Sequence, residues 1–443
     1  MPIGWRNLSA HLFGGPIENI LRGMATLAMG SVVAKAISLA AMPILTRLYT
    51  PADFGVLSVF TAVVSILVPV LSLTYLVALP IPRSERLAIN MFALACSINI
   101  LMSAIVLVLI WSVGPTILTI VSMESMIPYW WVVFIGVVCA SYSQIIRMWA
   151  TRRRAYRALS KVEVVQTLSG SIVKLILGVL AVQPLGLVIG GIVSQSGGIV
   201  TLTRVFYQDL KICLPYVTMR RMLSCASVFR GFPYFRLPSQ LLLVISSKAL
   251  IMFVAVVFDA EITGQVGLAL MAVAFPMIIL GDAISRPYYA EIAKLGRGAA
   301  HQVRIMTIAI IKRMLLLGAA PAIILMVSGP EIFAVVFGSQ WILAGQVASI
   351  LSIYIVCAFI SAPITSALNI FGKQHIFLQL NIQRAVLMGS VFMLAFYLEW
   401  ELLTVVLWYA IVMSLHHIFT TFRVLGCIGE GKRTIAEVQG AQP

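Results

Sequence analysis

Twelve long apolar runs decide what this chain can fold into. Each run is close to the roughly 20 mostly apolar residues that an α-helix needs to cross a bilayer. One soluble core cannot bury so many runs of this length, and lipid cannot satisfy an open strand edge, so we predict an all-helical protein with about 12 transmembrane helices. The predicted spans are 24–46, 54–78, 88–111, 128–149, 162–182, 185–206, 237–258, 262–284, 305–327, 341–367, 376–397 and 402–422.

Composition agrees with this fold class. Charged residues make up 10% of the chain and hydrophobic residues 61%, whereas a soluble domain usually carries about a quarter charged residues. The segment before the first span is polar and lacks the apolar core of a signal peptide, so that span is expected to be retained. The six cysteines include no CxxC pair, which indicates neither a disulfide framework nor a metal site.

The 31 basic residues predict the orientation. With the N-terminus inside, 27 of them fall in inner segments, Lys373 and Arg384 among them, and only Arg47 falls outside. Cytoplasmic segments of membrane proteins are rich in Lys and Arg, so we predict that both termini are cytoplasmic. The same rule accounts for the net charge of +16 without a nucleic-acid partner.

The longest inner connection, 207–236, separates six spans from six. It contains MRRMLSCASVFRGFPYF, in which apolar residues alternate with arginines at helical spacing. We expect an amphipathic helix on the anionic inner leaflet, either as a plain linker or as a lever or lipid-binding element. The predicted parts are an N-terminal six-helix lobe (1–206), this cytoplasmic connection, and a C-terminal six-helix lobe with a cytoplasmic tail (237–443).

The two halves share a weak repeat. Lys35, in the first span, is followed by LYTPADFG, which ends at Gly55. Lys248, in the seventh span, is followed by VVFDAEITGQVG, which ends at Gly267. Transporters are often built from duplicated units, and an even number of spans per half predicts two pseudo-symmetric lobes related by an axis along the membrane normal.

Three lysines, Lys35, Lys174 and Lys248, lie near the middle of predicted spans. A cation there costs roughly 2.5–3.5 kcal/mol on the insertion scale, and such residues usually face a bundle interior or a water-filled cavity. The alternative is a structural lysine paired with a backbone carbonyl or an acid. Glu163 shares a span with Lys174 but is 11 residues away, about three helical turns, which is too far for a direct pair.

Acidic residues are scarce within the spans. Glu163 and Asp282 lie at the inner ends of the fifth and eighth spans and are the candidates for ion coupling. A cationic cavity with so few carboxylates favours an anionic substrate and disfavours a pump for cationic drugs. On the outer side, Arg47 either releases substrate or, as we favour, anchors its turn by pairing with Asp53.

Six stretches between about 45 and 374 share a family pattern. They are LTRLYTPADFG (45–55), PIPRSERLAIN (80–90), RMWATRRRAYRALSKVEVVQ (147–166), FRGFPYFRLPSQLLLVIS (229–246), PYYAEIAKLG (287–296) and FGSQWILAGQVASILSIYIVCAFISAPITSALNIFGKQ (337–374). Together they resemble the polysaccharide and O-antigen flippases of the multidrug/oligosaccharidyl-lipid/polysaccharide exporter superfamily. The chain departs from that family at Lys248, where a polar uncharged residue is expected, and at SLTYLVALP (72–80), where an acid often follows the Tyr.

The resemblance implies two six-helix lobes around a central cationic cavity that opens alternately to each side of the bacterial inner membrane. The implied cargo is an undecaprenyl-pyrophosphate-linked oligosaccharide repeat unit, moved from the cytoplasmic to the outer leaflet for O-antigen or exopolysaccharide assembly. Lys35, Lys174, Lys248 and Arg47 would contact its pyrophosphate or acidic sugars. Membrane lipids, a polysaccharide polymerase and a chain-length regulator are the implied partners, and no cofactor is expected.

Two other functions compete with the flippase. A related multidrug exporter, working as an antiporter, tends to carry an acid in its first helix, where this chain has Lys35. An integral-membrane glycosyltransferase or ligase would need a long outer loop with catalytic residues, and the predicted outer turns are short. The flippase is therefore preferred and the exporter is the alternative.

Overall fold

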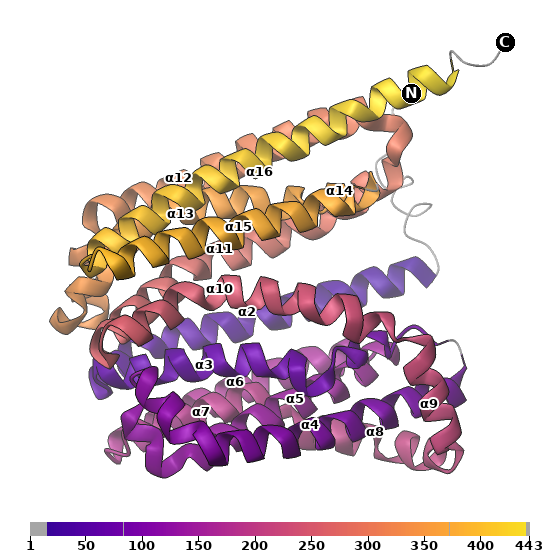
Figure 1. Ribbon diagram of the computed structural model, residues 1–443. Helices are drawn as coiled ribbons and strands as arrows, with labels where there is room; N and C mark the ends of the chain where they lie inside the picture. The colour runs from indigo at the N-terminus through magenta and orange to yellow at the C-terminus, as the bar shows by residue number, and fades with distance from the viewer. Residues whose placement is uncertain (1–15, 83, 372, 440–443) are drawn as a thin grey trace, which may run out of the picture. The chain divides into compact units, whose positions relative to one another are not determined.

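The computed structural model describes residues 16–82, 84–371 and 373–439, and no strand occurs among them (Figure 1). The longer helices are α2 (Pro16–Leu48), α3 (Pro51–Ser72), α4 (Glu85–Ile120), α5 (Trp130–Arg152), α6 (Tyr156–Val179), α7 (Leu185–Ser196), α8 (Gly198–Cys213), α9 (Met219–Val228), α10 (Leu237–Val257), α11 (Ala260–Leu295), α12 (Ala300–Phe337), α13 (Ile342–Ile364), α15 (Gln374–Tyr397) and α16 (Leu402–Gln439). Short turns join them: η1 (Tyr75–Ala78), η2 (Glu124–Tyr129), η3 (Leu214–Tyr216), the π-helical η4 (Phe232–Arg236), η5 (Arg297–Ala299), η6 (Ser339–Trp341) and α14 (Ala367–Ile370).

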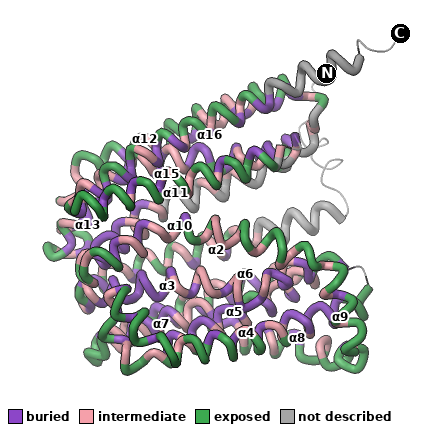
Figure 2. Tube along the Cα trace, viewed as in Figure 1, coloured by how far each residue is buried: buried purple, intermediate pink, exposed green. Residues whose placement is uncertain are grey.

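Within these residues, eleven helical segments are long and apolar enough to cross a membrane, and α11 begins with a shorter apolar stretch, Ala260–Ala274. They follow the order of the twelve predicted spans, which confirms an all-helical, multi-pass membrane protein. Many residues along these helices are exposed (Figure 2). They include many large apolar residues, as lipid-facing surfaces require.

Helix limits differ from the predicted ones where the backbone cannot continue a helix. The second span is predicted to reach residue 78, but α3 ends at Ser72 because Leu73 and Thr74 adopt left-handed angles, with φ of 43° and 57°. The ninth span is predicted to end at 327, but α12 continues through a kink at Ser328. Pro330 lies two residues beyond that kink and has no N–H with which to continue the hydrogen-bond ladder.

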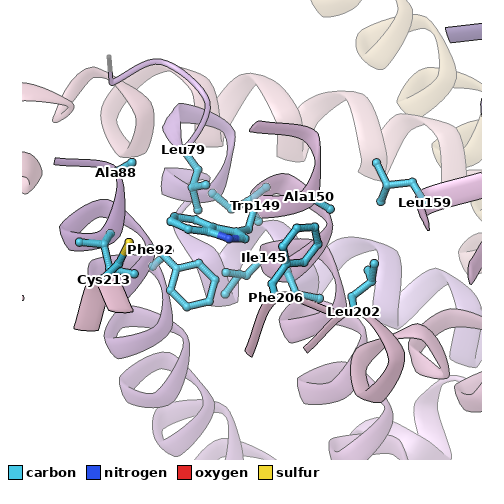
Figure 3. Packing of buried hydrophobic residues seen from close by; sticks show 14 of the residues in the cluster. Leu79, Ala88, Phe92, Ile145, Trp149, Ala150, Leu159, Leu202, Phe206 and Cys213 are labelled. Carbon is cyan, nitrogen blue, oxygen red and sulfur yellow. The ribbon is translucent and has the colours of Figure 1, made fainter. Parts of the chain in front are cut away.

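The chain divides into two compact units. The first contains the described part of 1–41 with 63–117 and 125–238. A core cluster of this unit joins α4, α5, α6 and α8 around Trp149 (Figure 3). Trp149 is fully buried, and its ring meets that of Phe92 edge-on with centroids 5.2 Å apart.

Charged side chains tie helix ends of this first unit together. Arg153, just after α5, makes two hydrogen bonds to Asp209 of α8, 2.8 Å from Nε and 2.7 Å from Nη2. The Trp149 indole also donates to Asp209, at 3.2 Å. Arg152 and Arg153 both pair with Glu85 at the start of α4. The two arginines at the end of α5 therefore connect the ends of α4, α5 and α8.

The second unit contains 42–62, 118–124 and 239–443. Helix α13 is its centre and packs against α11, α12 and α16. Gln340 and Trp341, just before α13, donate to the Thr46 carbonyl near the end of α2, at 2.7 and 3.2 Å. The Trp341 ring also meets Phe54 of α3 edge-on, with centroids 5.1 Å apart.

Helices α3 and α11 meet in this second unit through a reciprocal contact. A Cβ atom added to Gly55 would strike the carbonyl oxygen of Ala260, and one added to Gly264 would strike the carbonyl oxygen of Pro51. Gly55 and Gly264, like Pro51 and Ala260, are 209 residues apart. The contact therefore has approximate two-fold symmetry between matching positions of the two halves.

The caps of these two helices match at the same spacing. The Thr50 hydroxyl accepts a hydrogen bond from the backbone N–H of Asp53 at 3.3 Å, which begins α3. The Asp259 carboxylate accepts one from the backbone N–H of Ile262 at 2.7 Å, which begins α11. Ser/Thr/Asp side chains are preferred at this position because they satisfy helix N–H groups that have no partner within the helix.

The connection predicted at 207–236 contains the short helix α9, which belongs to the first unit. The Asn90 side chain binds the segment just before α9. The Asn90 amide donates to the Tyr216 carbonyl at 3.0 Å, and the Asn90 side-chain carbonyl accepts from the Thr218 N–H at 2.9 Å. Tyr75 donates to the Ala226 carbonyl at 3.1 Å. Buried Cys225 faces the same cluster as Tyr75, so α9 packs by one face.

Candidate functional site

Lys35 lies midway along the part of α2 that is apolar enough to span a membrane, and it is half-buried. Ser31, one turn earlier on the same helix face, donates to the Glu163 carboxylate of α6 at 2.8 Å. Gly30 packs directly on Ser160 of α6. The face of α2 that carries Lys35 is therefore turned toward α6.

Glu163 joins three helices of the first unit. Besides accepting the hydrogen bond from Ser31 of α2, its carboxylate lies close enough to Arg147 of α5 for an electrostatic attraction. Glu163 is half-buried. This arrangement gives the predicted ion-coupling acid a defined polar environment, and its role in coupling stays a prediction.

Lys174 lies farther along α6 and is half-buried. Its aliphatic stem packs on α7, where a Cβ atom added to Gly190 would strike the Lys174 Cγ. A Cβ atom added to Gly170 would lie 2.7 Å from the Gly190 carbonyl oxygen, so glycines allow α6 and α7 to approach closely here. The stem of Lys174 thus belongs to the packing between α6 and α7.

The second unit holds Lys248, Arg47 and Asp282. Lys248 is half-buried in the middle of α10. Arg47 is exposed near the end of α2 and donates to the Pro43 carbonyl at 3.2 Å. Its predicted pairing with Asp53 does not form, because the Asp53 carboxylate accepts from the N–H and hydroxyl of Thr50, both at 2.8 Å. Asp282 lies in α11, and its side chain is outside the described part of the structure.

The reciprocal contact between α3 and α11 corrects the register of the predicted repeat. The sequence pattern matches Gly55 with Gly267, but the structure matches Gly55 with Gly264, and Gly267 packs on Ser58 instead. With the 209-residue spacing, Lys248 corresponds to Leu39. Residue 39 is one helical turn from Lys35 on the same face. By this spacing, Lys35 and Lys248 occupy the same helix face in the two halves of the chain, at matched positions that differ by one helical turn.

Sequence reasoning did not single out a further cation within a span, Arg384. The orientation argument counts Arg384 with the inner segments, but it lies in α15 within the membrane-spanning stretch His375–Tyr397. His416 and His417 lie within the stretch Leu402–Ile428 of α16. A basic residue at the ninth position of the predicted span 376–397 was the signal that could have identified Arg384.

Metal-ligand clusters and disulfides are not features of the described residues. They contain no group of three or more His, Cys, Asp or Glu side chains arranged to hold a metal ion. All six cysteines, which lie within this part, are free thiols.

Comparison with solved structures identifies the fold. A multidrug resistance MATE family transporter of the MOP superfamily in an inward-facing conformation covers 92% of this chain and 96% of its own, with 14% identity and a TM-score of 0.61. A MOP superfamily transporter from Pyrococcus furiosus covers 96% and 98%, with 16% identity and a TM-score of 0.54. A mutant of the Vibrio cholerae MATE transporter VcmN covers 94% and 97%, with 14% identity and a TM-score of 0.54.

At these identities the likeness shows the fold alone, that of a two-lobed MATE-like transporter. No curated protein matches the chain. The model of one protein family, described as "Polysaccharide biosynthesis protein", matches residues 44–346, which is more than half of the chain. The chain therefore belongs to this family of polysaccharide biosynthesis proteins and has the fold of the MOP superfamily transporters.

Proposed function

We propose that this protein is a flippase for undecaprenyl-pyrophosphate-linked oligosaccharide repeat units. It moves them from the cytoplasmic to the outer leaflet of a bacterial inner membrane for O-antigen or exopolysaccharide assembly. The family and the transporter fold support membrane transport within polysaccharide biosynthesis. The specific cargo is inferred from the charge of the membrane-spanning helices.

The observation that carries the proposal is the excess of cations within membrane-spanning helices. Lys35 and Lys174 in the first unit, and Lys248 and Arg384 in the second, all lie within membrane-spanning stretches. Such residues are expensive in lipid and are usually retained for substrate or ion pathways. A lipid pyrophosphate carries charge that cannot enter hydrocarbon without compensation. Cations along the path supply that compensation, while the prenyl tail stays in the bilayer.

Translocation of this cargo requires no covalent chemistry. Binding from one side, a change of conformation and release on the other side suffice, as alternating access describes. Glu163, held by Ser31 and near Arg147, is our candidate for ion coupling in the first unit, and Asp282 is the candidate in the second. Exposed Arg47 is our candidate for a contact during release.

Membrane lipids are proposed partners of the connection that contains α9. Its outward face combines exposed Leu223, Val228 and Phe235 with Arg220 and Arg221. No acidic residue occurs between Asp209 and Asp259. Apolar side chains flanked by arginines suit the boundary between acyl chains and anionic headgroups. A polysaccharide polymerase and a chain-length regulator are the proposed protein partners, since they would use the exported unit.

A multidrug-exporter-like antiporter is the alternative, since the solved structures with this fold include MATE transporters. A cationic drug would need a carboxylate to pair with. The span that holds Lys35 has no acidic residue, and the Glu163 carboxylate already accepts a hydrogen bond from Ser31 and lies near Arg147. The balance of charge therefore favours an anionic cargo over a cationic one.

Reconstitution tests the proposal directly. Purified protein in liposomes should move a defined pyrophosphate-linked oligosaccharide to the opposite leaflet, where an added glycosidase can reach it. The matched control is the same oligosaccharide on an uncharged prenyl lipid, which should move much more slowly. Uptake of a fluorescent cationic drug without movement of the pyrophosphate lipid would overturn the flippase and favour the antiporter.

A further inference from the structure

Arg384 is a cation at mid-span in α15 of the second unit. Its Nη2 makes one long hydrogen bond, 3.5 Å, to the Leu243 carbonyl of α10. Its Nε is buried and has no hydrogen-bond partner among the described atoms. A guanidinium carries five N–H donors and stays charged, so this geometry leaves much of its donor capacity unused.

Two histidines and two tyrosines of α13 and α16 contact one another in this unit. The Tyr354 ring lies 5.7 Å from that of His417 and 5.4 Å from that of Tyr409, and the two tyrosine hydroxyls are 3.4 Å apart. His417 Nδ1 lies 2.6 Å from the Ser361 hydroxyl. The adjacent imidazole rings of His416 and His417 are 5.6 Å apart.

His416 is the most enclosed member, with only 5% of its surface exposed. Its Nε2 lies 3.5 Å from the Thr420 hydroxyl, whereas its Nδ1 is buried without a hydrogen-bond partner among the described atoms. Arg384 is close enough to Tyr409, His416 and His417 to interact electrostatically with all three. One cation and several unused or shared donors thus lie together.

Among the described residues, carboxylates that could neutralise Arg384 are not found on the helices around it. Helices α10, α13 and α15 contain no acidic residue, and those of α16 are Glu430 and Glu437. Glu430 is 14 residues beyond His416, about 21 Å along the helix. On α11 and α12 the described acidic side chains, Glu261, Glu291 and Glu331, form no ion pair with Arg384. Among the described side chains, the cluster is therefore positive and rich in donors.

We propose that Arg384, His416 and His417 form a binding site for a single small anion within the membrane-spanning part of the second unit. A guanidinium and adjacent N–H and O–H donors are the groups that recognise halide or phosphate-type anions. A bound anion would also offset the cost of a cation at this depth. The anion comes either from solution, as a free ion, or from the charged part of the transported lipid.

Chloride is the probe for the free ion. The unfolding midpoint of the full-length protein in detergent is measured across a chloride series, with gluconate holding ionic strength constant. Binding to the folded state should raise the midpoint with a saturable dependence on chloride. Arg384→Gln should weaken the apparent affinity by about tenfold or more, because a charge-assisted contact is lost. Arg423→Gln, an exposed arginine on α16, is the matched control and should respond like the wild type.

A second variant, His416→Gln, tests the same site if Arg384→Gln does not fold. His416→Gln keeps a polar group near Nε2 but removes Nδ1, and it should also weaken the chloride response. The proposal is overturned if chloride gives no saturable response in the wild type, or if both variants respond as the wild type does. Transport is not needed for this readout, so its failure is separable from failure of the flippase.

Competition distinguishes the two sources of the anion. Undecaprenyl pyrophosphate is added at increasing concentration while the chloride response is followed. Loss of the chloride response at saturating lipid, in the wild type and in Arg423→Gln alike, assigns the site to the charged part of the cargo. A chloride response that persists at saturating lipid assigns it to a free ion.

Discussion

A Cβ atom added to Gly264 would lie 2.9 Å from the backbone nitrogen of Gly55, and one added to Gly55 would lie 3.2 Å from that of Gly264. Each glycine thus packs against the backbone of the other in the same way. This reciprocal approach lets the starts of α3 and α11 cross with their backbones in contact. It also defines the 209-residue spacing that matches one half of the chain with the other.

Gly264→Ala should destabilise the protein by about 1–3 kcal/mol, because the new methyl group would collide with the Pro51 carbonyl and the backbones would have to separate. The thermal unfolding midpoint in detergent measures this. Gly389→Ala is the matched control, since a methyl group added to Gly389 of helix α15 would meet no atom within 4 Å. It should be neutral or slightly stabilising, because alanine favours a helix. Equal midpoints for the two variants would contradict the close crossing.

The span pattern was predictable because a helix in lipid needs only length and apolarity, both of which are local. The register of the repeat was not predictable. Matching Gly55 with Gly267 satisfies the local sequence pattern, but the true partner, Gly264, is defined by a contact between segments that are distant in sequence. The lysines were identifiable because a charge stands out in an apolar run. Arg384 carries the same signal, although the orientation argument counts it with the inner segments. Its environment was not predictable, since that depends on α10 and α16, which are far from it in sequence. The predicted pairing of Arg47 with Asp53 was wrong because Asp53 accepts hydrogen bonds from the N–H and hydroxyl of Thr50, while Arg47 donates to the Pro43 carbonyl.

Asp209→Asn should lower the stability of the first unit by about 1–3 kcal/mol, since the two-pronged ion pair with Arg153 becomes a neutral contact. The same unfolding assay applies. Glu85→Gln is the control, because its side chain is 52% exposed and exposed ion pairs contribute about 1 kcal/mol or less. A larger loss in Glu85→Gln than in Asp209→Asn would show that the contacts at α8 are not the stronger ones.

Cys225 should react slowly with alkylating reagents. Burial raises the pKa of its thiol, and only the thiolate attacks, so at pH 8 the reactive fraction is smaller than that of an ordinary cysteine. The rate should continue to rise with pH beyond the range in which an ordinary thiol levels off. Site-resolved mass spectrometry measures the rates. An exposed neighbour on α9, introduced by Ser227→Cys, provides the reference, and identical pH profiles at the two positions would refute the enclosed environment of Cys225.

Orientation is testable with single introduced cysteines. Ser122 is a poor position, since its hydroxyl donates to the Ala255 and Phe258 carbonyls and its φ is 55°. Exposed Ser125 and Arg157 are better choices. If the basic segments are cytoplasmic, an impermeant maleimide should label Ser125→Cys in intact spheroplasts, and Arg157→Cys only after permeabilisation. The reverse pattern would place the termini outside.

Replacing Lys35 or Lys248 by Ala should abolish surface glycan without lowering the amount of protein in the membrane. Each lysine lies within a span, where a cation costs roughly 2.5–3.5 kcal/mol, so its removal should not weaken insertion. Lys35→Arg and Lys248→Arg keep the charge and should retain at least part of the export. Lys211→Ala, at an exposed position on α8, is the control and should export normally. Surface glycan is measured by immunoblot against protein level by an epitope tag. Normal export by both alanine variants would show that these two lysines do not lie on the transport path, because other groups would then compensate the charge of the cargo.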